Sequence, residues 1–275
     1  MQTSPMIAYP RRMGSDRRAR NWGLSIVAGG VAAIVALAAW QPWRTTPSVE
    51  AATSVGAVAE VEPLSIPADA GVLVFGDSWT YGSAATLPTE GYAYRLGWLS
   101  GWNVTVDGVR GSGYMRPGYD GPDFRRRAEA LDPSADYDLI VIQGSINDRH
   151  QGERGYRETV DATWDTFERL YPRAQIVIFG PTPHEFPVDE GTARIDADLE
   201  AAADARHWWY ISPLQEQWLT PANYLEMIDT GAGRKHPSDR GHEYLAEKLF
   251  AALTERSTTT DAGATRDDAP EPVGP

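Results

Sequence analysis

A serine, a glycine-rich loop, an asparagine and a histidine follow one another along the chain, each at a position where chemistry could be placed. Residues 71–75 are an apolar run bounded by glycine that is typical of a buried parallel strand, and Ser78 follows it after Gly76 and Asp77. In an open α/β sheet, ligands bind beyond the carboxyl ends of the strands. Ser78 is therefore placed either to act on a ligand or, with Asp77, simply to cap the helix that follows.

Three later segments supply the groups that a serine nucleophile needs. Such a nucleophile requires a base that takes its proton and donors aimed at the developing oxyanion. His236, which precedes the last predicted helix, is a candidate base. Gly111 lies in a loop with three glycines in seven residues, which permits close approach of a ligand, and Asn147 is a neutral donor. Together these residue types favour acyl transfer.

Alternating strand-like and helix-like segments must position these residues. Expected strands are residues 71–75, 103–106, 137–142, 175–179 and 208–211. Expected helices are one that ends near residue 99 and those over residues 123–131, 156–170, 192–206 and 240–253. Five such alternations predict a parallel sheet covered by helices on both faces.

Four short blocks carry a resemblance to a known family. They are Gly76-Asp77-Ser78, Gly108-Val109-Arg110-Gly111, Ser145-Ile146-Asn147-Asp148 and His236-Pro237. In this order and on this α/β pattern, residues 71–254 resemble the SGNH hydrolases of the GDSL esterase/lipase superfamily. Trp79 replaces the leucine that is usual in the first block, and Ser145 stands in place of a glycine in the third.

The resemblance implies a flavodoxin-like fold with a five-stranded parallel sheet, and it implies roles for four residues. Ser78 is the expected nucleophile and His236 the expected base. The backbone N–H groups of Ser78 and Gly111 and the side-chain amide of Asn147 are the expected oxyanion hole. Neither a cofactor nor a metal is expected, because no cluster of histidines and carboxylates stands out at metal-ligand spacing.

The acid partner of His236 is the main departure from the family pattern. The family usually has an aspartate three residues before the histidine, and this position is Gly233 here. We rank first a Ser–His dyad whose imidazole donates to a backbone carbonyl. Asp229, on a flexible glycine loop, ranks second, and Asp239 is expected to cap the last helix instead.

The resemblance predicts a serine esterase that hydrolyses carboxylic esters through an acyl-Ser78 intermediate. Family substrates include O-acetylated carbohydrates, short-chain esters, lipids and thioesters. Two alternatives stay open, namely an acyltransferase that acylates envelope sugars and a non-catalytic glycan-binding or envelope-binding module. Gly233 and Ser145 keep the second alternative open, whereas the intact set of Ser78, Gly111, Asn147 and His236 argues against it.

The N-terminal region predicts a location at the cell membrane. Residues 22–40 carry no charge, are nearly long enough to span a bilayer, and have Trp at both ends. The Arg-rich residues 1–21 before them predict a cytoplasmic N-terminus and a catalytic domain outside the cytoplasm. A cleavable signal peptide, which would give a secreted protein, is the alternative. Residues 41–70 are interpreted as a linker and residues 255–275 as a disordered tail.

Charge and composition exclude several kinds of partner and chemistry. The 275-residue chain carries a formal charge of −13, and its first 20 residues hold five Arg and one Asp, so the remainder carries −17. A body this acidic argues against nucleic acid as a partner. The absence of cysteine excludes disulfides and a thiol nucleophile.

Overall fold

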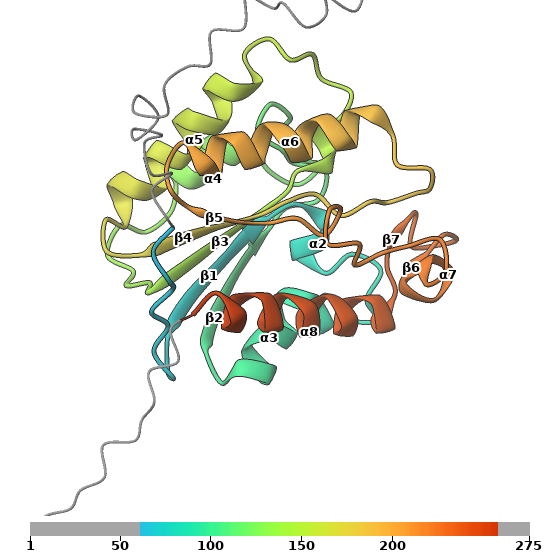
Figure 1. Ribbon diagram of the computed structural model, residues 1–275, viewed down its shortest axis with the longest axis horizontal. Helices are drawn as coiled ribbons and strands as arrows, with labels where there is room; N and C mark the ends of the chain where they lie inside the picture. Colours follow the sequence, from blue (N-terminus) through green and yellow to red (C-terminus); the bar gives the residue numbers. More distant parts are fainter. Residues whose placement is uncertain (1–60, 258–275) are drawn as a thin grey trace, which may run out of the picture. The chain divides into compact units, whose positions relative to one another are not determined.

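A five-stranded parallel sheet forms the centre of the computed structural model, which describes residues 61–257 (Figure 1). Its strands are β1 (Gly71–Gly76), β2 (Asn103–Gly108), β3 (Leu139–Gln143), β4 (Gln175–Phe179) and β5 (Trp209–Ile211). Their order across the sheet is β2-β1-β3-β4-β5, and every neighbouring pair is parallel. The predicted α/β class and five-stranded parallel sheet are therefore confirmed.

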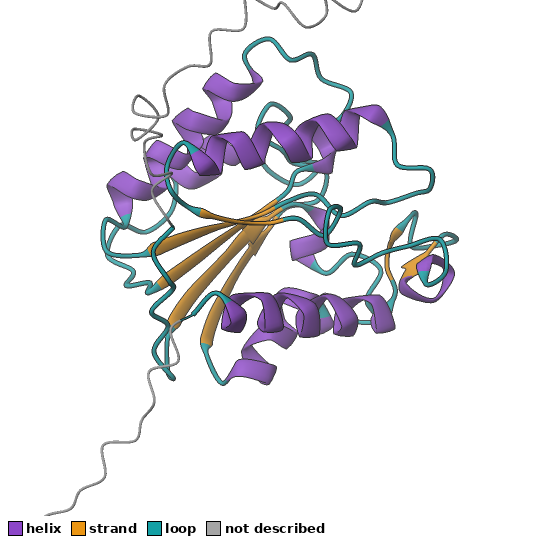
Figure 2. Cartoon of the chain, in the orientation of Figure 1, coloured by secondary structure: helices purple, strands orange, loops and turns teal. Residues whose placement is uncertain are grey.

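Two layers of helices cover the sheet, seen as purple ribbons on either side of the orange strands in Figure 2. Helices α3 (Tyr92–Ser100) and α8 (Asp239–Glu255) lie on one face. Helices α4 (Phe124–Glu129), α5 (Tyr156–Leu170) and α6 (Glu190–Asp204) lie on the other. Alternate residues of β1 enter the two cores, because successive side chains of a strand point to opposite faces. Burial on both faces explains the uninterrupted apolar runs of the central strands.

The segment after Ser78 differs from the expected single helix. A short helix α2 (Ser78–Tyr81) ends at Gly82, and a loop with the 3-10 helix η2 (Pro88–Glu90) separates it from α3. Gly82 has a φ of 89°, and a Cβ there would lie 2.2 Å from the carbonyl oxygen of Pro88. Glycine is required here because both the left-handed backbone and the lack of space exclude a side chain.

A small antiparallel hairpin that the sequence did not predict carries His236. Helix α7 (Tyr224–Met227) leads into β6 (Ile228–Asp229), which pairs with β7 (His236–Pro237) so that Asp229 lies opposite His236. The hairpin comes just before α8 and brings the histidine to the end of the sheet where β1 stops.

Residues 61–70, interpreted as part of a linker, pack against the domain. Leu64 is only 2% exposed, and its N–H donates to the carbonyl oxygen of Arg256. The Glu62 carbonyl accepts a hydrogen bond from the Trp209 indole at 2.9 Å. The proposed membrane segment, residues 22–40, lies outside the described residues. Between residues 61 and 257, none of the helices has the length and apolar character needed to span a bilayer.

Candidate active site

The turn from β1 into α2 presents Ser78 at the carboxyl end of the sheet. The Asp77 carboxylate accepts a hydrogen bond from Trp79 N at 2.9 Å and so caps α2, while Asp77 N donates to the side-chain oxygen of Gln143 at 3.2 Å. Burial raises the pKa of the Asp77 carboxyl. Asp77 thus caps the helix, and Ser78, the first residue of that helix, is left with its hydroxyl toward His236.

Ser78 and His236 form a hydrogen-bonded pair. The Ser78 Oγ lies 2.8 Å from His236 Nε2, and His236 Nδ1 lies 2.7 Å from the carbonyl oxygen of Gly233. A carbonyl can only accept, so Nδ1 carries the proton and Nε2 is left to accept from the serine hydroxyl. This is the tautomer that a general base for Ser78 requires.

The carboxylate of Asp229 does not contact the imidazole. Its two oxygens accept hydrogen bonds from Gly231 N at 2.8 Å and Gly233 N at 2.9 Å. A Cβ at Gly233 would lie 2.6 Å from the Asp229 Cβ and 2.7 Å from the Ala84 Cβ, so no side chain fits at this position. The structure therefore has the arrangement of a Ser–His dyad, with the Gly233 carbonyl as the partner of Nδ1.

Asp239 does not cap α8, so that expectation was wrong. Ser238 is the N-cap residue, because its Oγ accepts from Gly241 N at 3.1 Å. The Asp239 carboxylate accepts instead from the N–H and the hydroxyl of Thr86, both at 2.7 Å. Asp239 thereby fastens the loop between α2 and α3 to the start of α8.

Three donors that an oxyanion could use belong to residues that line the cleft, namely Ser78, Gly111 and Asn147. Asn147, in the 3-10 helix η3 (Ile146–Asp148), has its Nδ2 at 2.9 Å from the carbonyl oxygen of Ser112. The N–H groups of Ser78 and Gly111 have no acceptor within residues 61–257. Gly111 has a φ of 76°, and a Cβ there would lie 2.8 Å from the ring of Tyr119. The structure therefore brings together Ser78, Gly111, Asn147 and His236 in one cleft.

This cleft has a volume of about 830 Å³ and polar or small lining residues. The lining consists of Ser78, Tyr81, Gly82, Ser83, Ala84, Ala85, Pro88, Arg110, Gly111, Tyr119, Asn147, Asp229, Ala232, Gly233, Arg234 and His236. No Leu, Ile, Val, Met or Phe of the described chain lines it. Of the aromatic residues near the site in sequence, Tyr81 and the 79% exposed Tyr119 border the cleft, whereas Trp79 and Tyr114 are buried.

Arg127 bonds to residues at the ends of β1 and β2 and is buried, although the basic run of residues 125–127 is more typical of a solvated helix face. Its guanidinium donates to the carbonyl of Gly76 at 2.8 Å, to Ser112 Oγ at 2.8 Å and to the carboxylate of Asp107 at 2.7 Å. It also lies 4.1 Å from the ring centroid of Phe75. Because Arg127 follows Phe124 by three positions, helical spacing could have placed it on the buried face of α4.

Asp148 bonds to the backbone that directly follows the glycine-rich loop. Its carboxylate accepts from Tyr114 N at 2.7 Å and from Met115 N at 3.2 Å. Burial raises the pKa of this carboxyl to about 6, although both backbone hydrogen bonds oppose the shift. A Cβ at Gly113 would lie 2.4 Å from the Asp148 carboxylate, so this loop and η3 fit together closely.

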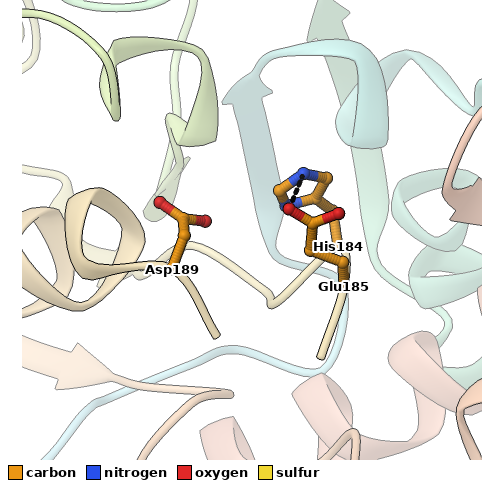
Figure 3. A group of neighbouring side chains, drawn as sticks. All are labelled: His184, Glu185 and Asp189. Carbon is orange, nitrogen blue, oxygen red and sulfur yellow. Dashed lines mark ion pairs between the residues drawn. The ribbon is translucent and has the colours of Figure 1, made fainter. Parts of the chain in front are cut away.

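A second polar cluster, His184 with Glu185 and Asp189, lies after β4 (Figure 3). One ligand atom from each residue lies within 4.8 Å of the others, so the expectation that no such cluster has metal-ligand spacing was wrong. The groups have partners within the protein, however. Glu185 forms an ion pair with Lys235 and lies 3.6 Å from His184 Nε2, while Asp189 caps α6 by accepting from Thr192 N at 3.0 Å. A metal ion would have to displace these contacts.

Comparison with known proteins identifies the family. The model of the GDSL-like lipase/acylhydrolase family matches residues 74–244. The chain is also similar to the GDSL lipase Rv0518 of Mycobacterium tuberculosis (strain ATCC 25618 / H37Rv), with 30% identity over 198 residues, which cover 66% of this chain and 81% of that protein. The chain belongs to the GDSL-like lipase/acylhydrolase family. It is an SGNH-type serine hydrolase that acts on ester bonds.

Solved structures share the fold. A putative lipolytic protein of the G-D-S-L family from Desulfitobacterium hafniense DCB-2 is similar with a TM-score of 0.55 and 16% identity, covering 66% of this chain and 99% of that one. A carbohydrate acetylesterase family member from Sinorhizobium meliloti is similar with a TM-score of 0.52 and 17% identity, covering 68% and 98%. At these identities the likeness concerns the fold.

Proposed function

We propose that this protein hydrolyses short acyl esters of polar alcohols, including O-acetyl groups on glycans. The observation that carries the proposal is the Ser78–His236 hydrogen bond of 2.8 Å at an open cleft lined by polar and small residues. A long fatty acyl chain is best bound by large aliphatic side chains, and the described lining contains no Leu, Ile, Val, Met or Phe. The structural neighbour from Sinorhizobium meliloti is a carbohydrate acetylesterase family member, which supports the same substrate class.

The proposed reaction has two steps that use the same residues. Ser78 Oγ attacks the ester carbonyl carbon while His236 Nε2 takes its proton, and the oxyanion accepts from Ser78 N, Gly111 N and Asn147 Nδ2. The C–O bond to the alcohol breaks, and His236 returns the proton to the leaving oxygen. Water then attacks the acyl-Ser78 carbonyl, with its proton passing to His236. Collapse releases the carboxylic acid, and Ser78 Oγ regains its proton.

We further propose that the enzyme acts outside the cytoplasm and is anchored in the cell membrane by residues 22–40. Support comes from the sequence, because an uncharged segment with Trp at both ends follows an Arg-rich stretch. A secreted protein remains the alternative if that segment is cleaved. A tethered, outward-facing enzyme would meet envelope or external glycans, which agrees with the polar cleft.

Hydrolysis of p-nitrophenyl acetate and octanoate by the full-length protein tests the activity. We expect acetate to be the better substrate and Ser78→Ala to abolish turnover, because the nucleophile is lost. Asn147→Ala should lower kcat about a hundred- to a thousandfold, the usual cost of one oxyanion donor. Lack of hydrolysis, together with no labelling of Ser78 by a fluorophosphonate, would exclude the hydrolase activity and favour the binding module.

An acyltransferase would use the same residues, and one further assay separates it from a hydrolase. The acyl-Ser78 intermediate would then pass its acyl group to a sugar hydroxyl instead of water. Incubation with an acyl donor and a sugar acceptor, followed by mass spectrometry, would reveal acylated sugar. The esterase proposal expects free carboxylic acid as the main product.

A further inference from the structure

We propose that Ser145 is a positioning residue that holds Asn147 in the orientation needed for oxyanion stabilisation. The proposal rests on the proposed esterase function. Ser145 stands where the family motif has a glycine, so its hydroxyl is a feature of this chain. It is fully buried, and its φ of −121° and ψ of 126° are open to any residue, so the backbone alone does not explain a serine here.

The Ser145 hydroxyl makes two hydrogen bonds, one as donor and one as acceptor. Its Oγ donates to the carbonyl oxygen of Ser112 at 2.9 Å and accepts from Asn147 N at 3.1 Å. The same Ser112 carbonyl accepts from Asn147 Nδ2 at 2.9 Å. Asn147 is thus fixed at its backbone and at its amide, through one hydroxyl and one carbonyl. An amide nitrogen carries two hydrogens, so one bonds to the Ser112 carbonyl, and the other, which has only the long 3.5 Å contact with Asp77 Oδ2, can serve the oxyanion.

A competing acceptor makes this restraint necessary. The carboxylate of Asp77 is buried, and its Oδ2 lies 3.5 Å from Asn147 Nδ2. Asp77 Oδ2 and the Ser112 carbonyl are therefore two acceptors within reach of the same amide nitrogen. If Asn147 were free to turn, Asp77 would draw the amide away from the cleft. The Ser145 hydroxyl opposes this turn by holding Asn147 N through a hydrogen bond of 3.1 Å.

Kinetics of Ser145→Ala, Asn147→Ala and the double variant test the proposal in the full-length protein. With p-nitrophenyl acetate we expect Ser145→Ala to lower kcat about 5- to 30-fold, a fraction of the loss expected for removing the donor itself. KM should change less than twofold, since the oxyanion forms after binding. In the Asn147→Ala background, Ser145→Ala should cost no further activity, because Ser145 acts through Asn147.

Ser212→Ala is the matched control. Ser212 is also buried, donates to the Asp196 carboxylate at 2.8 Å and accepts from Gln215 N at 3.0 Å, but it does not line the cleft. It should lower the melting temperature while kcat stays within twofold. If Ser145→Ala does not fold, Ser145→Gly removes the same hydroxyl and introduces the residue of the family motif.

The outcomes distinguish the two proposals. An inactive wild type overturns the proposed function and, with it, this inference. An active wild type whose kcat is unchanged in Ser145→Ala overturns the inference alone. An equal loss of kcat from Ser145→Ala in both backgrounds also overturns it, because the hydroxyl would then act on the fold and not through Asn147.

Discussion

The partner of the His236 imidazole is a backbone carbonyl instead of a carboxylate. The Gly233 carbonyl fixes the tautomer, since it accepts from Nδ1 at 2.7 Å, but it carries no full charge to stabilise the imidazolium that forms during the reaction. Asp229 does not bond to the imidazole; its carboxylate accepts hydrogen bonds from Gly231 N and Gly233 N. Its carboxylate therefore shapes the loop that holds the histidine.

Asp229→Asn tests this arrangement. Asparagine keeps one acceptor oxygen, so the loop should loosen moderately and kcat should fall less than tenfold. Replacing a true triad aspartate by asparagine costs about ten-thousandfold. Steady-state kinetics with p-nitrophenyl acetate separate the two cases, with Asp132→Asn as a control outside the cleft lining. A loss beyond a thousandfold would mean that Asp229 takes over Nδ1 in the reacting enzyme.

The motif residues could be predicted from the sequence, but the groups that hold them in position could not. Ser78 and His236 stand in blocks whose order identifies them. The acceptor for Nδ1 is a main-chain atom, which leaves no signature in the residue type. Its position depends on Arg234 and Lys235, both of which adopt a positive φ that side chains rarely take. In the sequence, Ser145 is only a departure from the glycine of the family motif; the hydrogen bond that its hydroxyl accepts from Asn147 N is visible in the structure alone.

At the level of elements, α4 fastens the ends of two strands through Arg127. The guanidinium bonds to the carbonyl of Gly76 at the end of β1 and to Asp107 near the end of β2. Its side chain is 5% exposed, and burial lowers its pKa. Removing one partner of a buried ion pair leaves the other charge uncompensated, which typically costs about 3–5 kcal/mol.

We therefore expect Arg127→Met to lower the free energy of unfolding by about 3 kcal/mol, with the lower end taken because Asp107 is partly exposed. Arg126→Met is the matched control on the same helix, because its side chain is 74% exposed and should matter by less than about 0.5 kcal/mol. Urea unfolding followed by tryptophan fluorescence measures both. Similar losses for the two variants would contradict a special role for Arg127.

Long periodic elements were predicted well, and short ones were missed. The expected bounds of α5 and β4 agree with the structure, because an apolar stripe or a continuous apolar run defines each of them. The hairpin of β6 and β7 has two residues per strand, too few for any periodicity to appear. The short α2 was hidden because Gly82, which ends it, was not recognised as a stop.

For the whole molecule, His242 joins three parts that surround the cleft. From α8, its Nδ1 accepts from Tyr92 N at the start of α3, and its Nε2 donates to the carbonyl of Ser83 in the cleft-lining loop, both at 3.1 Å. Burial lowers the pKa of His242 to about 4, and the nearby Arg95 acts in the same direction, whereas Asp239 opposes it. The neutral ring is therefore part of the folded structure at neutral pH.

Acid should destabilise the protein through this histidine. Between the unfolded pKa of 6.5 and the folded pKa of about 4, the unfolded chain binds more protons, so the free energy of unfolding falls as the pH falls. The contribution is fully present above pH 6.5, and about 3 kcal/mol of it is lost by pH 4. Asp148, whose folded pKa is raised to about 6, acts with the opposite sign, because its contribution is lost as the pH rises.

Comparison with His242→Gln separates these two effects, because Asp148 titrates in both proteins. Urea unfolding from pH 7.5 to pH 4 should find the wild type more stable at pH 7.5, with a difference that shrinks by about 3 kcal/mol on acidification. A difference that stays constant with pH would show that His242 titrates alike in the folded and unfolded chains. The same histidine holds Ser83 beside the cleft. We therefore expect wild-type esterase activity to be lost at the acidic end of this range before global unfolding is complete.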